Sequence, residues 1–417
     1  MTATIPPITV PGDKSIAHRA LILAALARGE SRLRNLPAGL DVRSTQRALR
    51  ALGVAMREEG GAVVVTGSGG ELVAPPEPID CGNSGTTIRL LAGVLATRAI
   101  VVTLDGDASL RARPMRRIAK PLAAFGTRLE LTPYGTAPFV LHGNGEARGT
   151  EVEIVVPSAQ VKSAVLFAAL GAHGPTRLTG ELATRDHTER LFGAFGVSCR
   201  RENGALIVDG PQVPTACDVD VPGDMSSAAF LLAAAAAVPG ARAVVENVGL
   251  NPTRTAFLEV LRRFGAEIDV QTTHFAAEPR GRVAVRGAAL HAIVVEPDEV
   301  PGLIDELPLV GVLGAFARGT TVVSGAAELR VKESDRIETF ARAARTLGAE
   351  VETFSDGFAV RGPAPWRSGT IITAGDHRIA MAFAVAARAA GVSVSLDDPD
   401  CVAVSFPGFA RALELVA

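Results

Sequence analysis

Cysteine is scarce in this 417-residue sequence, and its placement argues against two kinds of site. The chain has four cysteines, at positions 81, 199, 217 and 401, and no two of them have CxxC spacing. A disulfide framework or a zinc site of the usual spacing is therefore not expected, and we predict a reducing, cytoplasmic location.

Long apolar runs and an excess of charge of one sign are also missing. The longest apolar run, residues 228–238, stops at Pro239 and is too short to cross a bilayer. No basic-then-apolar leader precedes Pro6, so we expect no export signal and no membrane association. The formal net charge of −2 argues against a nucleic-acid partner. Any site for an anion must therefore be built locally, from a few converging cations and backbone amides.

Lysine is the rarer of the two basic residue types by a wide margin. Of 42 basic residues only four are lysine, namely Lys14, Lys120, Lys162 and Lys332. Where arginine is so strongly favoured, a remaining lysine is expected at positions that need a compact ammonium group rather than a planar guanidinium.

What the sequence does contain is a repeat. A chain of this length indicates two domains, and six segments share one design, a Gly/Ser/Asn/Asp-rich turn that runs into an Ala/Leu-rich helix about 70 residues from the next. They begin at Gly12, Gly82, Ser158, Gly223, Leu303 and Gly375. These helices are apolar nearly all round and are predicted to be buried.

Each repeat then continues with a second, amphipathic helix and with strands. Five of the second helices end in a bulky apolar residue followed by the left-handed stop that glycine favours, at Gly53, Gly126, Gly196, Gly265 and Gly348. Alternating or β-branched runs predict strands at residues 62–65, 151–156, 284–286 and 320–323. The predicted unit is helix, strand, helix, strands, in six copies.

The polar turns at the helix starts are candidate anion sites. Lys14 and Ser15 open the first helix and Arg19 lies one turn further on, so that a cation, a hydroxyl and free amides come together. Residues 83–89 are rich in small side chains that let a ligand approach the backbone, and Arg113-Pro114 is predicted to open another helix. For any one copy, polar residues before a helix are also ordinary caps.

Further polar clusters follow along the chain. Residues 158–162 offer a hydroxyl, an amide and an ammonium within one turn, and residues 185–189 are densely polar, with a His and a Glu that are either catalytic or capping. Asp305-Glu306 is predicted inside an apolar helix, where a buried carboxylate would suit a general base. Residues 330–336 form the densest charged cluster, either a solvated face or an anion site at a helix start.

Taken together, these fragments resemble the EPSP synthase family, the 3-phosphoshikimate 1-carboxyvinyltransferases. The similarity runs in order from Val10 to Pro407, and GNSGTTIR from Gly82 and RVKESDRIETF from Arg330 are similar to the two signature patterns of that family. GDKS, SAQVK, RDHTE and NPTR, the last at residues 251–254, are similar to four short motifs of its class II branch.

The resemblance implies an α/β enolpyruvyl transferase fold of two domains, each with three βαβαββ units and pseudo-threefold symmetry. It implies an inserted N-terminal domain of residues 12–221, a C-terminal domain of residues 1–11 plus 222–417, and an active site in the interdomain cleft. The implied reaction transfers the enolpyruvyl group of phosphoenolpyruvate to the 5-hydroxyl of shikimate 3-phosphate, in the route to chorismate and the aromatic amino acids. The enzyme is a glyphosate target in that family. No metal or organic cofactor is expected, and we expect a monomer.

The resemblance also implies roles for individual residues. Implied contacts to shikimate 3-phosphate are Lys14, Ser15, Arg19, Ser158, Ala159, Gln160, Arg185, Asp305 and Lys332. Implied contacts to phosphoenolpyruvate are Lys14, Asn83, Gly85, Arg113, Gln160, Arg336 and Arg378. Asp305 would accept the proton of the 5-hydroxyl, and Glu333, with Lys14 or His377, would handle the proton at the methylene carbon.

Two departures from the family pattern bear on these expectations. Val404 stands where some relatives carry a lysine that reaches phosphoenolpyruvate, and Leu90 stands where class I members have proline. The class II motifs suggest tolerance to glyphosate. Against this, Gly85 keeps the small pocket that glyphosate-sensitive members have.

Two alternatives remain open on the sequence alone. The related transferase that acts on UDP-N-acetylglucosamine typically uses a cysteine in a mobile loop, and residues 111–115 contain none. In the other alternative the chain is a non-catalytic binding protein whose polar turns are caps.

Overall fold

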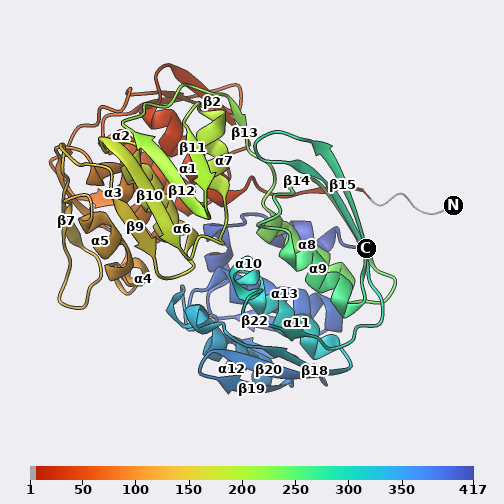
Figure 1. The fold of residues 1–417 in the computed structure, drawn as a ribbon. Coiled ribbons are helices and arrows are strands. Elements are labelled where there is room, and N and C mark those ends of the chain that lie inside the picture. Colours follow the sequence, from red (N-terminus) through yellow and green to blue (C-terminus); the bar gives the residue numbers. More distant parts are fainter. Residues whose placement is uncertain (1–5) are drawn as a thin grey trace. The chain divides into compact units, whose positions relative to one another are not determined.

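A computed structural model describes residues 6–417 of the chain (Figure 1). These residues form two compact units. The inserted unit is Gly12–Val221, and the split unit consists of residues 6–11 together with Pro222–Ala417. Each unit has its own hydrophobic core.

The helices of the inserted unit alternate between buried and half-exposed. They are α1 (Lys14–Leu26), α2 (Leu40–Ala51), α3 (Gly85–Ala96), α4 (Ala108–Arg111), α5 (Arg116–Ala123), α6 (Ala159–Ala169) and α7 (His187–Ala194). Its strands are β2 (Glu30–Arg34), β3 (Ala55–Glu59), β4 (Ala62–Thr66), β5 (Ile79–Asp80), β6 (Val101–Asp105), β7 (Arg128–Glu130), β8 (Phe139–His142), β9 (Glu151–Ile154), β10 (Gly174–Gly180), β11 (Cys199–Glu202), β12 (Ala205–Gly210) and β13 (Val219–Asp220).

The split unit repeats the same alternation. Its helices are α8 (Met225–Ala236), α9 (Ala256–Phe264), α10 (Val300–Leu303), α11 (Leu307–Phe316), α12 (Arg336–Thr346), α13 (His377–Ala390) and α14 (Phe409–Glu414), with 3₁₀ turns η1 (Ala327–Val331) and η2 (Pro399–Val404). Its strands are β1 (Ile8–Thr9), β14 (Arg242–Gly249), β15 (Glu267–His274), β16 (Arg280–Arg286), β17 (Val294–Val295), β18 (Gly319–Val323), β19 (Glu350–Phe354), β20 (Gly357–Gly362), β21 (Gly369–Ile371) and β22 (Val394–Leu396).

The sheets have one recurring topology. In the sheet β9-β10-β12-β11, seen side by side in Figure 1, β9 and β10 are parallel and the remaining neighbours are antiparallel. Helix α6 connects the two parallel strands, as a parallel pair requires a crossover. The sheets β5-β6-β8-β7 and β17-β18-β20-β19 repeat this order, and the predicted α/β enolpyruvyl transferase fold is confirmed at the level of the repeat.

The sixth repeat differs from the predicted unit. Within residues 6–417 it forms only the parallel pair β21-β22 around α13, without the two antiparallel strands. The stretch that follows β22 contains Pro399 and Pro407, which disfavour a central strand, and it folds into η2 and α14 instead.

In two repeats, the parallel strand pair is made by segments that lie far apart in the sequence. β1 precedes α1 in sequence but pairs in parallel with β14 of the split unit, with Ile8 opposite Val245. β13 precedes α8 but pairs in parallel with β2 of the inserted unit, with Val219 opposite Leu33. Both sheets are completed by strands from their own unit even though the chain passes twice between the units.

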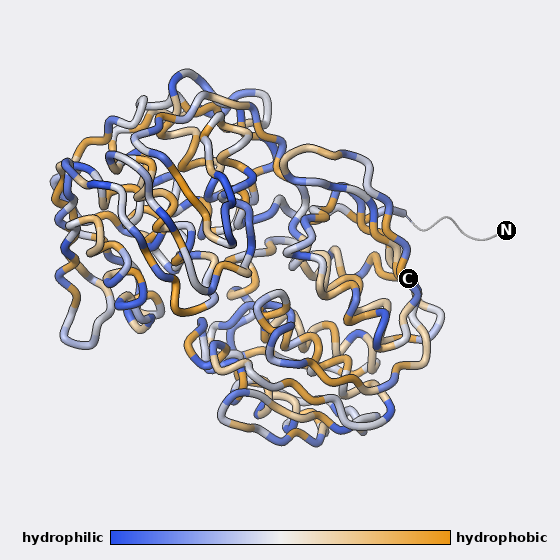
Figure 2. The backbone as a smooth tube through the Cα atoms, viewed as in Figure 1, coloured by the Kyte–Doolittle hydropathy of each residue, from blue (hydrophilic) through white to orange (hydrophobic). Residues whose placement is uncertain are grey.

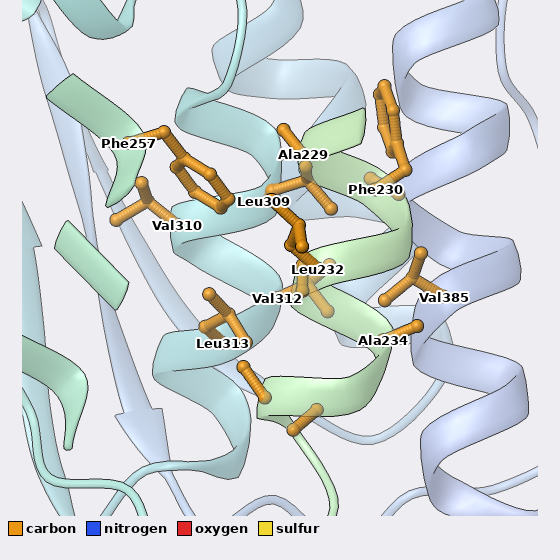
Figure 3. Packing of buried hydrophobic residues seen from close by; sticks show 14 of the residues in the cluster. Ala229, Phe230, Leu232, Ala234, Phe257, Leu309, Val310, Val312, Leu313 and Val385 are labelled. Carbon is orange, nitrogen blue, oxygen red and sulfur yellow. The ribbon is translucent and has the colours of Figure 1, made fainter. Parts of the chain in front are cut away.

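The apolar helices are buried as predicted. All twelve residues of α8 are buried, and the long apolar runs of such helices can be followed in the hydropathy colouring of Figure 2. Figure 3 shows how α8 packs, with Phe230 directed toward α13 and Leu232 beside Leu309 and Val312 of α11. Burying a large aliphatic or aromatic side chain contributes about 1.5–3 kcal/mol each.

The amphipathic helices end as the sequence predicts. Gly53, Gly126, Gly196, Gly265 and Gly348 all have positive φ, between 71° and 111°. Glycine adopts this left-handed conformation without a Cβ clash, and so it terminates each helix at its expected place. The predicted strands at 62–65 and 320–323 are confirmed, 284–286 is the end of the longer β16, and β9 ends two residues before the predicted Val156.

Two predicted helix starts are wrong in detail. Asp305 and Glu306 do not lie within a helix, because α10 ends at Leu303 and α11 begins at Leu307, with Pro308 in its first turn. Proline favours that position since its missing N–H is not needed there. Pro114 does not open a helix either, and α5 begins at Arg116. None of the described helices is long and apolar enough to cross a membrane.

Candidate active site

The buried helices of the inserted unit begin with capped polar turns that are tied to one another. Asp13, Ser84 and Ser158 are the N-caps of α1, α3 and α6, and each side chain accepts a backbone N–H of its own helix. Such caps satisfy some of the N–H groups at a helix start, and the amides that remain suit an anion. Side chains then link the three starts.

Lys14 lies in the first turn of α1 and is partly accessible. Its Nζ is 2.7 Å from Asp41 Oδ2 on α2, and the lysine side chain is 21% exposed while that of Asp41 is 9% exposed. Ser15 follows it and is half-buried. An ammonium group beside a helix N-terminus is favourably placed for an anion.

Arg19 is more deeply buried than the sequence suggests. Its Nε donates to Thr188 Oγ1 at 2.7 Å, its Nη2 to Ser163 Oγ at 2.7 Å, and its Nη1 to the carbonyl of Ser15 at 2.8 Å. Only 2% of the residue is exposed. Arg19 therefore joins α1 to α6 and α7 and fixes the backbone of Ser15.

Two arginines converge on Gly85. Arg113 Nη2 donates to Asn83 Oδ1 at 2.5 Å and to Ser109 Oγ at 3.2 Å. Arg89 Nη1 donates to Gln160 Oε1 at 2.6 Å and to the Gly85 carbonyl at 3.3 Å. A Cβ on Gly85 would lie 2.7 Å from Arg89 Nη1 and 3.2 Å from Arg113 Nη1, so the absence of a side chain lets both cations approach the backbone.

Sequence reasoning gave Arg89 no role, and the structure shows why it belongs with the site. It is 6% exposed and connects α3 to α6 through Gln160, whose Nε2 donates to Thr86 Oγ1 at 3.0 Å. The available signal was its position one helical turn after Gly85. Ala159 opens α6 beside Gln160, and Arg185 is half-buried in the loop between β10 and α7.

The helix starts of the split unit carry a second polar cluster, centred on Arg336, the first residue of α12. Its Nη2 is 2.6 Å from Glu333 Oε2, its Nε is 2.8 Å from Asp376 Oδ2, and its Nη1 is 3.5 Å from Asp305 Oδ1. The side chain is 1% exposed. Burial opposes the charge, but the surrounding carboxylates outweigh it and raise the pKa of Arg336 above its ordinary value.

Asp305 lies between two guanidinium groups. Besides Arg336, Arg378 approaches it, with Nε 3.6 Å from Asp305 Oδ1 and Nη1 donating to the Asp305 carbonyl at 3.2 Å. Arg378 also lies 4.0 Å from Glu306 Oε1. The turn that interrupts the predicted helix thus holds the carboxylate of Asp305 against two cations from α12 and α13.

A buried chain of polar groups extends from this cluster to α8. Ser226 donates to Glu306, and Arg254 Nη2 donates to Ser226 Oγ at 2.7 Å and to Asp224 Oδ1 at 3.0 Å. Asp224 is the N-cap of α8. Arg254 is the last residue of the NPTR motif, so this motif contributes a buried cation to the chain.

The remaining predicted residues of the split unit occupy different environments. Lys332 is half-buried, with Nζ 3.8 Å from Glu328, and burial lowers its pKa although Asp305 and Glu328 act in the opposite direction. His377 begins α13 and is 2% exposed. Val404, the position where some relatives carry a lysine, ends η2.

The predicted site residues therefore lie at helix starts and in adjoining loops of the two units. A cavity of about 350 Å³ in the inserted unit is lined by Pro78, Asp80, Gly82, Asp105, Gly106, Asp107 and Arg111, and Asp107 accepts from Asn83 Nδ2 at 2.9 Å. Its three carboxylates make it unsuited to an anionic substrate.

Known proteins of one family are similar to the chain over nearly its whole length. A sequence profile of the family described as EPSP synthase (3-phosphoshikimate 1-carboxyvinyltransferase) matches residues 5–413. The chain belongs to this family. The 3-phosphoshikimate 1-carboxyvinyltransferase of Halorhodospira halophila is 47% identical over 407 residues, covering 97% of this chain and 92% of the relative. That of Anaeromyxobacter sp. strain Fw109-5 is 47% identical over 409 residues, covering 98% and 95%.

Solved structures also support membership in this family. An EPSP synthase from Acinetobacter baumannii has a TM-score of 0.85 at 38% identity and covers 98% of this chain and 95% of its own. The enolpyruvyl transferase NikO from Streptomyces tendae shares the fold, with a TM-score of 0.77 at 17% identity over 98% of this chain and 94% of its own.

Membership in the EPSP synthase family settles the two alternatives that the sequence left open. The resemblance is confirmed, the chain is a transferase rather than a binding protein, and the matched family is not the one that acts on UDP-N-acetylglucosamine.

Proposed function

We propose that the chain transfers the enolpyruvyl group of phosphoenolpyruvate to the 5-hydroxyl of shikimate 3-phosphate, which yields 5-enolpyruvylshikimate 3-phosphate and phosphate. The observation that carries this proposal is the position of Asp305, a carboxylate held between Arg336 and Arg378 at the starts of α12 and α13. A base beside paired cations is what an addition to a bound anion requires.

The inserted unit supplies the groups for shikimate 3-phosphate. The first turns of α1 and α6 offer an ammonium, hydroxyls and backbone amides, which together match a phosphate group. The proposed contacts are Lys14, Ser15, Arg19, Ser158, Ala159, Gln160 and Arg185, with Asp305 and Lys332 from the split unit. Arg19 is buried and donates to the Ser15 carbonyl. We therefore propose that it supports the backbone of Ser15 in addition to contacting shikimate 3-phosphate.

The cations around Gly85 and Asp305 supply the groups for phosphoenolpyruvate. We propose Arg336 and Arg378 from the split unit, and Lys14, Asn83, Gly85, Arg113 and Gln160 from the inserted unit. Arginine binds carboxylates and phosphates through two parallel N–H groups, and in the structure those N–H groups are directed at protein oxygens. Substrate oxygens would replace some of these partners, so the arginines are already oriented before binding.

Three proton movements follow from the reaction. The methylene carbon of phosphoenolpyruvate takes up a proton, and the neighbouring carbon gains oxocarbenium character. The 5-hydroxyl attacks that carbon while its proton passes to Asp305, and a tetrahedral ketal forms. Loss of a methyl proton and of phosphate then restores the double bond. Glu333 is the proposed group for the methyl proton, because it lies on Arg336 within the same cluster, with Lys14 or His377 as its partner.

We propose that the two clusters act on one pair of substrates in the cleft between the domains, residues 12–221 and residues 1–11 plus 222–417. Both substrates are anions, and a water-poor site lined by fixed cations offsets their repulsion. The groups assigned to phosphoenolpyruvate come from both units, so neither cluster is sufficient.

The test is phosphate release from phosphoenolpyruvate. We expect release when shikimate 3-phosphate is present, and none with either substrate alone or with UDP-N-acetylglucosamine as acceptor. Asp305→Ala removes the proposed base, and a positioned base typically contributes about 10²–10⁴-fold to the rate. Near-normal turnover of Asp305→Ala would rule out this role, whereas release without shikimate 3-phosphate would rule out the reaction.

Two further properties are proposed with the function. We propose a monomer in the cytoplasm, supported for location by the cysteines at 81, 199, 217 and 401, which are all free thiols. Sedimentation of the purified enzyme tests the monomer, and fractionation of the source cells tests the location.

Tolerance to glyphosate is proposed from the class II motifs. These motifs supply buried cations, for example Lys162 of SAQVK and Arg254 of NPTR. We expect a higher inhibition constant than that of class I enzymes under the same conditions. An inhibition constant equal to that of class I enzymes would refute the proposed tolerance and leave the proposed reaction unaffected.

A further inference from the structure

The SAQVK and RDHTE motifs meet in one buried ion pair that the proposed reaction does not use. Lys162 lies in α6 and Glu189 in the first turn of α7, and Lys162 Nζ is 2.7 Å from Glu189 Oε1. The lysine side chain is fully buried and that of Glu189 is 14% exposed. Two motifs that are separated in sequence are thus the two ends of a single contact.

Lys162 also holds the loop that leads to Arg185. Its Nζ donates to the carbonyls of Leu182 and Thr184, both at 3.3 Å. These residues form tight turns after β10, since Leu182 N–H donates to the Gly180 carbonyl and Thr184 N–H to the Leu182 carbonyl. Two carbonyl oxygens and one carboxylate oxygen therefore surround the ammonium group.

Stability alone does not explain a charge at this depth. A buried ion pair can often be replaced by apolar side chains without loss of stability, because desolvation of both charges offsets their attraction. The contacts that an apolar side chain cannot reproduce are those to the loop carbonyls. A guanidinium is planar and longer, so it does not fit three oxygens arranged around one point.

We propose that Lys162 is a positioning residue, which fixes the loop of residues 181–186 so that Arg185 reaches shikimate 3-phosphate held at the start of α6. This inference rests on the proposed function. The start of α6 carries Ser158 and Gln160, and Lys162 lies in the same turn, so one helix both offers substrate contacts and fixes the loop that carries another. Glu189 balances the charge of Lys162 and holds α7 to α6.

The decisive variant replaces both charges, Lys162→Met with Glu189→Met. Lys162→Met alone leaves Glu189 without its cation, so we expect a clear fall in melting temperature for that single variant. The double variant is expected to recover most of the melting temperature and yet to keep a raised KM for shikimate 3-phosphate, by about tenfold or more, because the loop carbonyls have lost a charged donor. Its kcat should stay within about twofold of wild type, since the reacting groups are untouched.

The control is Lys120→Met, at an exposed lysine of α5, which should change neither the melting temperature nor the KM. A double variant with the wild-type KM overturns the positioning role and leaves the pair purely structural. Should the double variant not fold, Lys162→Arg decides, because it keeps the charge beside Glu189 but cannot reproduce the contacts to the loop carbonyls, and it is expected to raise the KM. A wild-type KM for Lys162→Arg would overturn the inference. Absence of turnover in the wild-type enzyme would instead refute the proposed function.

Discussion

At the scale of single residues, Arg336 and Lys14 show how two cations of one proposed site can differ in what they stabilise. Arg336 is almost fully enclosed by protein and lies against the carboxylates of Asp305, Glu333 and Asp376, whereas Lys14 is partly exposed and lies against Asp41. The sequence alone predicts that replacing either weakens anion binding while the fold survives. The burial of Arg336 leads to a different expectation.

Arg336→Ala should weaken both stability and binding. It leaves Asp376, Glu333 and Asp305 without their shared guanidinium, and breaking a buried ion pair typically costs about 3–5 kcal/mol. Lys14→Ala should lower the free energy of unfolding by less than Arg336→Ala, because the Lys14 side chain is partly exposed and that of Arg336 is not, and should still raise the KM of the anionic substrates. Urea unfolding together with steady-state kinetics measures both effects, and Arg342→Ala, exposed on the same helix, is the control. Equal stability losses for Arg336→Ala and Lys14→Ala would contradict this account.

Gly85→Ala tests whether the space above α3 is needed by the arginines. The added methyl would sit 2.7 Å from Arg89 Nη1 and 3.2 Å from Arg113 Nη1, so at least one guanidinium must move. We expect a raised KM for phosphoenolpyruvate and little change in that for shikimate 3-phosphate. Gly193→Ala on α7 is a suitable control, because a Cβ there meets nothing within 4 Å and should leave both KM values unchanged. Unchanged kinetics of Gly85→Ala would show that the arginines adapt without cost.

At the scale of elements, a buried chain of hydrogen bonds connects three helices of the inserted unit. His18 Nδ1 is 2.6 Å from Thr45 Oγ1, Thr45 Oγ1 is 2.7 Å from Thr87 Oγ1, and Thr87 donates to Ser84 Oγ at 2.7 Å. The chain runs from α1 through α2 to the N-cap of α3. The contacts that position Gly85 therefore begin with a histidine in the core of the unit.

This histidine should make the fold sensitive to acid. Burial lowers the pKa of His18 from 6.5 to about 3; Asp41 opposes this, while Lys14 and Arg19 add to it. The unfolded chain binds a proton below pH 6.5 and the native chain does not, so stability is lost as the pH falls from 6.5 toward 3. At pH 5 the expected loss is about 2 kcal/mol of unfolding free energy relative to neutral pH. Unfolding at a series of pH values should show a shallower slope for His18→Asn than for wild type, and an unchanged slope for His274→Asn at an exposed site. Equal slopes for His18→Asn and wild type would contradict the proposed link between His18 and acid sensitivity.

Much of the element pattern was predictable because its causes are local. Helix starts depend on a capping side chain, and helix ends depend on a glycine with positive φ, so both can be found from neighbouring residues. The turn at Asp305 was missed because the apolar pattern continues through it, and only Pro308 marked the new start. Contacts such as Arg89 with Gln160 could not be predicted, since periodicity says which face of a helix is buried but not which helix covers it. For the same reason Lys162 and Glu189 could each be singled out from the sequence, while their pairing with one another could not.

At the scale of the whole molecule, each unit has its own core, and the two core clusters have no residue in common. Within each unit, the two points where the chain enters or leaves that unit also lie close together. In the inserted unit, Asn35 Nδ2 donates to the carbonyl of Val221 at 2.7 Å, and a Cβ on Gly12 would lie 3.2 Å from the Val221 side chain. In the split unit, Asp224 N–H donates to the carbonyl of Pro11 at 2.8 Å.

This arrangement predicts that the units can be separated. Residues 12–221 expressed alone keep every strand of their sheets, including β13 beside β2, and residues 1–11 joined by a short glycine linker to residues 222–417 keep β1 beside β14. We expect both proteins to unfold cooperatively on heating, as a unit with a complete core should. Neither should release phosphate from phosphoenolpyruvate, because the proposed contacts to that substrate come from both units. Circular dichroism melts and the phosphate assay measure the two properties separately, with the intact chain as reference. A cooperative but catalytically active single unit would refute the shared site, whereas an unfolded one would show that the cores depend on each other despite their separate residues.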